Sequence, residues 1–269
     1  MKIGLVASRL DKASMGILEH LKGYIKFREV REDYYESDLA PVLVSRNDIV
    51  YADEASKWAK DLNLDLLIFL SRHSMERPRP MITLHTPGNW GSETPLGGKP
   101  SFVAISEPRV LSNLYRLISS RIGELQGYEA NIEATHHGPA IDGAAIFVEI
   151  GSTEAEWGDV KAQEFVAGII YELLSNPGRF MSGGRPVAVS IGDLHYVTLA
   201  RHVLQGEYDL GHVVPKYVKV DERVIEMAVN RNSVRPDIAI IHWKALKRDE
   251  RELAKAKLMS MGVNVVKRG

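Results

Sequence analysis

The chain has 269 residues, enough for one large domain or two smaller ones. Hydrophobic residues make up 45% and charged residues 26%, which is typical of a globular protein and excludes a disordered chain, a coiled coil and a collagen-like repeat. The net charge of −1 excludes a uniformly basic nucleic-acid coat, and the absence of cysteine excludes disulfides, cysteine zinc sites and thiol nucleophiles.

The elements expected from the sequence alternate between short apolar runs and longer amphipathic segments. Buried strands are predicted, in chain order, at Ile3–Ala7, Leu66–Leu70, Met81–Leu84, Ala144–Val148, Val187–Ser190 and Ile238–Ile241, with a further strand near Ala130–Ala134 and partly exposed ones at Val42–Val44 and Asp48–Tyr51. Helices are predicted at about 13–22, 53–62, 107–122, 154–174, 221–230 and 247–259. The clearest starts at Glu154, where Thr153 and Glu156 fit a capping box.

This alternation predicts a layered α/β fold with a central mixed or mostly parallel sheet flanked by helices. No shift in composition marks a boundary, so we expect a single domain over residues 1–269. No apolar run approaches the roughly 20 residues of a membrane helix, and charges follow the apolar N-terminal run at once, unlike a signal peptide. We therefore expect a cytoplasmic protein that makes no membrane contact.

Polar residues follow several of the predicted strands. Ligands of open α/β sheets bind beyond the carboxyl ends of the strands, so parallel strands would bring these side chains together at one edge. The residues concerned are His73, His85, His136, His137, Glu149 and His195, with Glu133 on the strand before His136. Of the other histidines, His20 and His202 fall in helical patterns, and no partner motif accompanies His242. We expect an active site at this edge, although each histidine alone would more often be a surface or hydrogen-bonded loop residue.

The chemistry open to these residues is limited by the motifs that are missing. No H-E-x-x-H, G-x-S-x-G or P-loop signature is present, so the sequence contains no serine nucleophile of that type and no nucleotide-binding loop. A hydrolase would therefore use water, activated by histidine, glutamate or a metal ion, and imidazole suits zinc. His136 and His137 are neighbours and could face one site only where the strand ends, which Gly138-Pro139 allows.

The charges are distributed unevenly along the chain. Residues 124–164 carry a local net charge of −8 and residues 241–269 one of +5. Such runs usually form solvated faces, but the basic one could also contact a polyanion. The turn Gly151–Thr153 could present free N–H groups to an anion, or could merely cap the following helix.

Several strings in the chain resemble a known family when taken in order. They are Ser71-Arg72-His73, Leu84-His85-Thr86-Pro87-Gly88-Asn89, Glu133-Ala134-Thr135-His136-His137-Gly138-Pro139, Glu149-Ile150-Gly151-Ser152-Thr153-Glu154 with Trp157, and Gly211-His212 with Pro215-Lys216-Tyr217. Together they resemble the archaeal and plant type of D-aminoacyl-tRNA deacylase, also called D-tyrosyl-tRNA deacylase, over essentially the whole chain. The resemblance implies a phosphorylase/hydrolase-like sheet, hydrolysis of the ester between a D-amino acid and tRNA, and zinc as cofactor.

On this resemblance we expect three groups of site residues. The catalytic group is His73, His85, Glu133, His137, Glu149, Glu154 and His195, and zinc would be held among His85, His136, His137 and His195. The substrate-binding group is Asn89, Gly151, Ser152, Thr153, Tyr196, Lys216, Lys247, Arg248 and Arg251, with Lys219 and Lys255 as further contacts to tRNA phosphates. Glu154 could alternatively bind the ammonium group of the substrate.

One segment departs from the family pattern, which usually reads G-G-G-H-Y-A-P-R. This chain has Ile191-Gly192-Asp193-Leu194-His195-Tyr196-Val197-Thr198, so His195-Tyr196 persists while two glycines and the Pro-Arg pair do not. Two other functions stay open from the residues alone. They are a different enzyme, either a metal-assisted hydrolase or one like a nucleoside phosphorylase, and a non-catalytic RNA-binding protein. The substrate partner would be D-aminoacyl-tRNA, and no obligatory protein partner is inferred.

Overall fold

The computed structural model describes all residues, 1–269, and contains two main sheets. The first has eight strands in the order β2-β3-β4-β1-β5-β10-β6-β9. Their bounds are β2 Arg28–Arg31, β3 Tyr34–Glu36, β4 Val42–Ser45, β1 Ile3–Ser8, β5 Leu66–Ser74, β10 Ala144–Ser152, β6 Met81–His85 and β9 Glu129–Ile132. Strands β4, β1, β5 and β10 are parallel, whereas β6 runs antiparallel to β10 and parallel to β9. The predicted mixed α/β architecture is confirmed.

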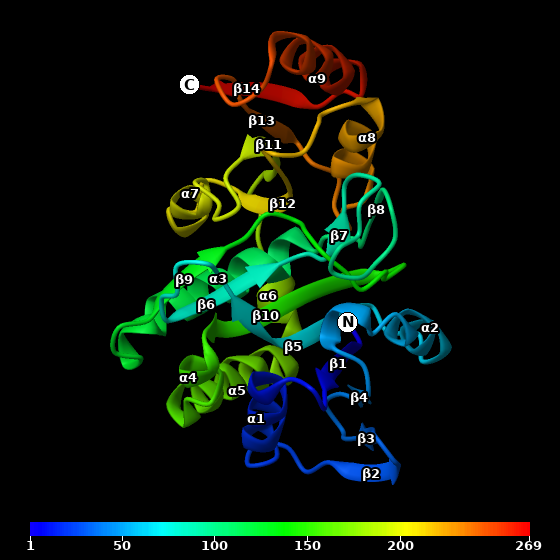
Figure 1. The fold of residues 1–269 in the computed structure, drawn as a ribbon, viewed down its shortest axis with the longest axis vertical. Helices are drawn as coiled ribbons and strands as arrows, with labels where there is room; N and C mark the ends of the chain where they lie inside the picture. Colours follow the sequence, from blue (N-terminus) through cyan, green and yellow to red (C-terminus); the bar gives the residue numbers. More distant parts are fainter.

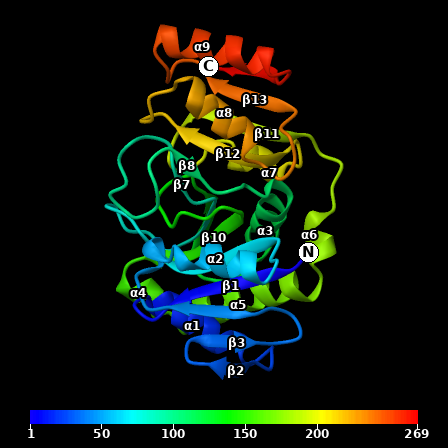
Figure 2. The same ribbon diagram turned by 90° about the vertical axis from the view of Figure 1, so that its right-hand side faces the viewer.

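The second sheet is built by the C-terminal part of the chain. It consists of β12 Asp209–Pro215, β11 Val187–Asp193, β13 Ile238–His242 and β14 Asn264–Arg268, all parallel in that order. A short pair, β7 Gly88–Asn89 and β8 Phe102–Val103, lies between the two sheets in Figure 1. Figures 1 and 2 place the second sheet at one end of the long axis and β2 and β3 at the other.

The helices cover both faces of these sheets. Their bounds are α1 Lys12–Leu21, α2 Glu54–Asp61, α3 Pro108–Arg121, α4 Glu154–Trp157, α5 Val160–Ser175, α6 Pro177–Met181, α7 Ala200–Leu204, α8 Glu222–Asn230 and α9 Arg248–Ser260, with 3-10 turns at η1 Ile49–Tyr51 and η2 Ile122–Glu124. None combines the length and the apolar character that a bilayer-spanning helix requires.

The central strands are buried on both faces, which explains their continuous apolar runs. Ile68 and Val148 face one side and pack in the core that α1 and α5 complete. Phe69 and Phe147 face the other side, where their rings stack at 4.6 Å between centroids in a separate cluster that includes Trp58 of α2. The core that contains Ile68 and Val148 also includes Leu210 of β12, so it extends to both sheets.

Several predicted elements are corrected by the structure. Asp48–Tyr51 is not a strand, because Ile49–Tyr51 forms the 3-10 turn η1. The single helix expected over 154–174 is divided into the two helices α4 and α5. The first ends before Gly158, and Asp159 then caps the second by accepting from the Lys161 N–H. The predicted capping box of Thr153 and Glu156 is confirmed. Strands β2, β3, β12 and β14 lie in segments where no strand was expected.

Arg116 of α3 connects this helix with the second sheet. Its guanidinium donates to Asp209 at 2.8 Å and to the carbonyls of Val203 and Tyr208 at 2.8 and 3.0 Å. Asp209 is fully buried at the start of β12, so loss of the arginine would leave its charge unpaired. We expect Arg116→Met to lower the free energy of unfolding by about 3–5 kcal/mol.

Arg121→Met is the matched control on the same helix, because Arg121 pairs with Glu124 and Glu172 at the surface. Such exposed pairs contribute under about 1 kcal/mol. Denaturant unfolding of both variants measures the difference, and equal losses would show that Arg116 does not connect the layers as described.

The buried carboxyl of Asp11 should make the free energy of unfolding depend on pH. It caps α1 by accepting from the Ser14 N–H and also accepts from the Arg72 N–H, while burial raises its pKa to about 6. Between pH 4 and 6 the unfolded chain ionises this carboxyl and the folded chain retains the proton, so stability falls as pH rises. A shift of about 2 units at about 1.4 kcal/mol each gives a loss of about 3 kcal/mol. Measured from pH 4 to 7, the free energy of unfolding of the wild type should fall by this amount relative to that of Asp11→Asn, whereas the exposed Asp38→Asn control should follow the wild type.

Candidate functional site

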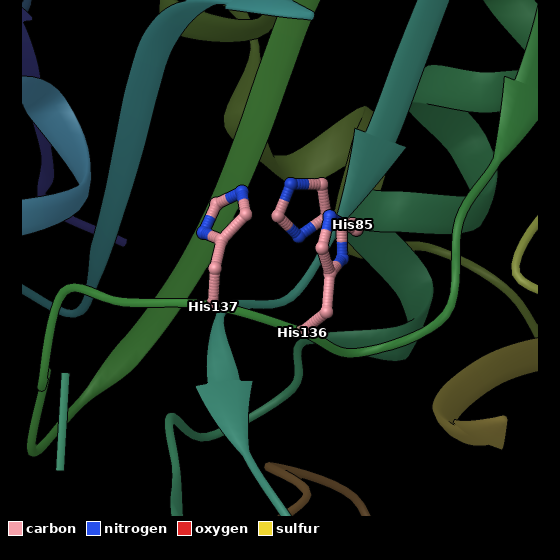
Figure 3. A group of neighbouring side chains, drawn as sticks. All are labelled: His85, His136 and His137. Carbon is pink, nitrogen blue, oxygen red and sulfur yellow. The ribbon is translucent and has the colours of Figure 1, made fainter. Parts of the chain in front are cut away.

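Three histidines come together where β6 ends and the loop after β9 passes it. His85 is the last residue of β6, and its ring centroid lies 4.2 Å from that of His136 and 4.7 Å from that of His137. Figure 3 shows His136 and His137 on the same side of their loop, both directed toward His85. His137 has a φ of 43°, in the left-handed region, so the chain is no longer extended there and neighbouring side chains can face one site. The loop is held by the Gly88 N–H, which donates to the His137 carbonyl at 2.6 Å.

The hydrogen bonds of these rings determine which nitrogen is free. Nδ1 of His136 donates to the Ala134 carbonyl at 2.8 Å, Nδ1 of His137 to the Gly138 carbonyl at 2.6 Å, and Nδ1 of His85 to the Thr86 carbonyl at 3.3 Å. A carbonyl only accepts, so Nδ1 carries the proton and Nε2 keeps its lone pair in each neutral ring. Nε2 of His85 is buried and has no hydrogen-bond partner.

Two glutamates and His73 form the adjoining part of the site. Nδ1 of His73 lies 3.3 Å from Glu149 Oε2 and 3.3 Å from Glu133 Oε1. Glu149 also accepts from Thr83 Oγ1 at 3.2 Å, and Nε2 of His73 contacts the Tyr196 hydroxyl at 2.8 Å. Glu133 is 2% exposed, and neither of its oxygens has a hydrogen-bond partner.

The register of the first sheet explains this grouping. Glu149 of β10 pairs with Ser71 of β5 and with Thr83 of β6, and Phe147 pairs with His85. Directly paired residues point to the same face, so the glutamate and the histidine project from one face of the sheet. The convergence expected at a carboxyl edge of parallel strands therefore has a different cause, because β6 is antiparallel and the residues meet on a face. Phe147 lies beneath His85 in a stacked contact at 5.0 Å.

The second sheet supplies His195 and Tyr196. Nε2 of His195 lies 3.8 Å from Glu133 Oε1, and its ring lies 4.5 Å from that of His136. Asp193 holds the loop by accepting from the N–H groups of Leu194 and Thr198, the latter at 3.2 Å. The segment that departs from the family pattern thus still delivers both side chains. We call the whole group the histidine–carboxylate cluster: His73, His85, Glu133, His136, His137, Glu149 and His195.

Burial and mutual charge set the protonation of the cluster. Burial lowers the pKa of His137 to about 3 and of His195 to about 4, and the charge of His85 adds to both shifts. Burial likewise lowers the pKa of His136 well below its usual range. These three rings are neutral at pH 7, which is the form that binds a metal ion or accepts a proton.

The pKa values of the two glutamates in the cluster are shifted in opposite directions. Burial raises the pKa of Glu133 to about 7, and the charge of Glu149 adds to this. For Glu149 burial acts in the same direction, but the hydrogen bond from His73 and the closeness of His85, whose Nε2 lies 3.6 Å from Glu149 Oε1, outweigh it and hold the pKa of Glu149 well below the usual range. Burial would lower the pKa of His73, yet its hydrogen bond to Glu149 and the charge of Glu133 raise it. These opposite shifts in pKa favour an ion pair between His73 and Glu149, whose side chains are both buried. Glu133 and Glu149 are buried, so not all of the acidic segment 124–164 forms a solvated face.

The remaining predicted site residues lie outside these contacts. Asn89 is buried and donates to the Gly97 carbonyl, whereas Glu154 is exposed at the start of α4. The N–H groups of Ser152 and Thr153 are not free for an anion, because Glu156 Oε2 accepts from both at 3.2 and 2.8 Å. Gly151 pairs with His73 inside the sheet.

The predicted basic residues divide into two groups. Lys216 is exposed at the end of β12 and Lys219 lines a cavity beside the histidines. Lys247, Arg248, Arg251 and Lys255 belong to α9 and its N-cap, which Figures 1 and 2 place at the far end of the second sheet.

Sequence reasoning missed several residues of the site. Thr83 could have been found from its alternate spacing with His85 on one strand. Tyr217 was part of a recognised string but had no assigned role, and its hydroxyl lies 3.3 Å from His195 Nδ1. Asp193 gave no signal, because its function depends on loop geometry.

Two cavities meet at the histidines. One of about 640 Å³ and another of about 400 Å³ are both lined by Leu96, His136 and His137. Volumes of this size are typical of small-molecule sites. A mixed α/β sheet that carries buried neutral imidazoles, an ion pair and an unpartnered carboxyl beside two cavities defines an enzyme-like site for acid–base or metal-assisted chemistry.

Comparisons with known proteins agree with this class. Residues 60–266 match the family model described as D-aminoacyl-tRNA deacylase. A D-aminoacyl-tRNA deacylase of Caldivirga maquilingensis is 56% identical and is covered over its full length, as is this chain. A second, from Pyrobaculum aerophilum, is 34% identical over 89% of this chain and 96% of its own. The crystal structure of a conserved protein of unknown function superposes with a TM-score of 0.88 over 99% of this chain and 95% of the other, at 27% identity. The chain belongs to the D-aminoacyl-tRNA deacylase family.

The His73–Glu149 pair generates a prediction for the metal-free protein. Glu149→Gln removes the charge that favours protonated His73, so the pKa of His73 should fall by at least about one unit. An NMR pH titration of the histidine ring resonances measures it. Glu154→Gln makes the same change at an exposed position and should leave the His73 titration unchanged. If His73 titrates identically in Glu149→Gln, the ion pair is not the source of its shift.

Proposed function

We propose that this protein hydrolyses the ester that joins a D-amino acid to the 3′ end of tRNA. The observation that carries the proposal is the group of three imidazoles, His85, His136 and His137, whose donor atoms lie within 4.8 Å of one another beside two cavities, in a member of this family. Water attacks the ester carbonyl carbon, the new carbon–oxygen bond forms, and the bond to the ribose oxygen breaks. The proton lost by water must reach that ribose oxygen, which leaves as a hydroxyl.

We assign the transfer of this proton to Glu133. Its oxygens lie 3.3 Å from His73 Nδ1 and 3.8 Å from Nε2 of both His136 and His195, and no hydrogen bond occupies them. A buried carboxyl without a fixed partner can accept a proton and return it without first breaking a protein hydrogen bond. His73 lies on one side of this carboxyl and His195 on the other.

The donor set at His85, His136 and His137 fits zinc. Their donor atoms lie within 4.8 Å of one another, each Nδ1 is fixed by a carbonyl, and Nε2 of His85 has no hydrogen-bond partner. Zinc sites commonly use neutral imidazole whose second nitrogen donates to an oxygen in this way. We therefore assign a zinc ion to these three residues, and when bound it supplies a polarising positive charge and a water of lowered pKa. His195, the fourth predicted ligand, instead groups with Glu133 and His136.

The function is tested by release of amino acid from D-Tyr-tRNA and L-Tyr-tRNA. We expect release from the D ester only, and a loss of about 100-fold or more in rate for Glu133→Gln if Glu133 moves the proton. Glu129→Gln, an exposed neighbour on β9, should retain the wild-type rate. Equal release from both esters, or none, would exclude the proposed reaction.

The zinc assignment is tested by measuring the zinc content of the purified protein. Purified wild-type protein should contain about one zinc ion per chain by elemental analysis. His85→Ala, His136→Ala and His137→Ala should each lose most of it, because each removes one of the ligands. His202→Ala, at a residue that pairs with Glu207 away from the cluster, should keep it. Full zinc content in all three variants would contradict the assignment, and so would wild-type deacylation that survives complete chelation.

A further inference from the structure

The two cavities beside the histidines differ in their free charge. Lys219 and Arg223 line the larger one, and neither has a carboxylate within ion-pair distance. The Arg223 guanidinium donates only to the Ser101 carbonyl, at 3.2 Å, and the Lys219 ammonium is exposed without a partner. In the smaller cavity both cations have carboxylate partners, since Arg72 pairs with Asp48 at 2.5 Å and His73 with Glu149 at 3.3 Å.

Two carboxylates also line the larger cavity. Asp221 is engaged as the cap of α8, where it accepts from the Val224 N–H at 2.9 Å. Glu93 lies on the separate loop between β7 and β8 and accepts from the Ser92 hydroxyl. The β12–α8 side of the cavity therefore presents two cations that have no carboxylate within ion-pair distance.

An exposed aromatic ring lies at the same place. Tyr217 is 64% exposed, although its ring lies 6.5 Å from that of His195 in a stacked arrangement. Exposed aromatic rings beside cations are typical of sites for single-stranded nucleic acid, where a base stacks on the ring and the phosphate meets the cation. The smaller cavity has an apolar wall of Ile49, Val50 and Leu96, with Tyr51 49% exposed at its side.

From this asymmetry, and resting on the proposed function for the choice of ligand, we propose a division of the substrate between the cavities. The larger cavity binds the unpaired terminal nucleotides of the tRNA, with a base against Tyr217 and a phosphate at Lys219 and Arg223. The smaller cavity receives the side chain of the amino acid. The ester between the two parts then lies beside His136 and His137, which both cavities share.

The test uses the full chain and a fluorescent C-C-A RNA trinucleotide, whose binding is read by anisotropy and requires no turnover. We expect Lys219→Ala and Tyr217→Leu each to weaken binding about 10-fold or more. Lys219→Ala should also reduce the slope of log affinity against log salt by about 0.7, because one phosphate contact is lost. Tyr217→Phe keeps the stacking ring and loses the hydroxyl at His195, so it should bind as the wild type does.

Controls separate the two cavities. Lys244→Ala, at an exposed lysine outside the cavity, should leave trinucleotide binding unchanged. Tyr51→Ala should also leave it unchanged, while altering the ratio of kcat/KM for D-Tyr-tRNA to that for D-Ala-tRNA. The proposal is overturned if wild-type protein does not bind the trinucleotide, if Lys219→Ala and Tyr217→Leu bind it normally, or if Tyr51→Ala weakens it. Failure of the wild type to release D-tyrosine from tRNA, with the expected trinucleotide pattern intact, would instead refute the proposed function alone.

Discussion

The antiparallel pairing of β6 with β10 is the constraint on which the site depends. It sets Thr83 opposite Glu149 and His85 opposite Phe147, so that two polar side chains of β6 and a glutamate of β10 share one face of the sheet. A polar cluster on a buried face is costly unless its members satisfy one another. The carboxylate of Glu149 meets this requirement by accepting from Thr83 and His73.

The two sheets contribute different parts of the chemistry. The first sheet and the loop after β9 hold both glutamates and the three histidines assigned to zinc. The second sheet and the segments that follow its strands contribute His195 and Tyr196, together with the two cations of the larger cavity. Arg116 and the shared apolar core keep these parts in register. The site therefore lies where the two sheets meet, and its geometry depends on packing between segments far apart in the chain.

The unsatisfied atoms of the cluster are informative because buried polar groups normally have partners. His85 Nε2 and both oxygens of Glu133 are buried without hydrogen bonds. Their cost in folding energy is understandable if they serve a ligand and a proton in the reaction, since functional sites tolerate local violations that a core would not. The same reasoning distinguishes the larger cavity, where Lys219 and Arg223 have no carboxylate partner, from the smaller one, where Arg72 and His73 each have one.

The amino-acid sequence by itself determined the fold class, the main buried strands and most of the cluster. Short apolar runs ending in His73, His85 and Glu149 carry that information locally, and the strings around Glu133–Pro139 indicate the family. It could not determine strand direction, the break between α4 and α5, or the exposed strands β2 and β3, whose short polar sequences lack a periodic pattern. Only the tertiary structure decided that the Glu156 carboxylate accepts from the N–H groups of the turn that was expected to bind an anion. It also decided that α9 lies far from the histidines, whereas Tyr217 and Lys219 lie beside them. Those relations depend on contacts between distant segments, which no local spacing encodes.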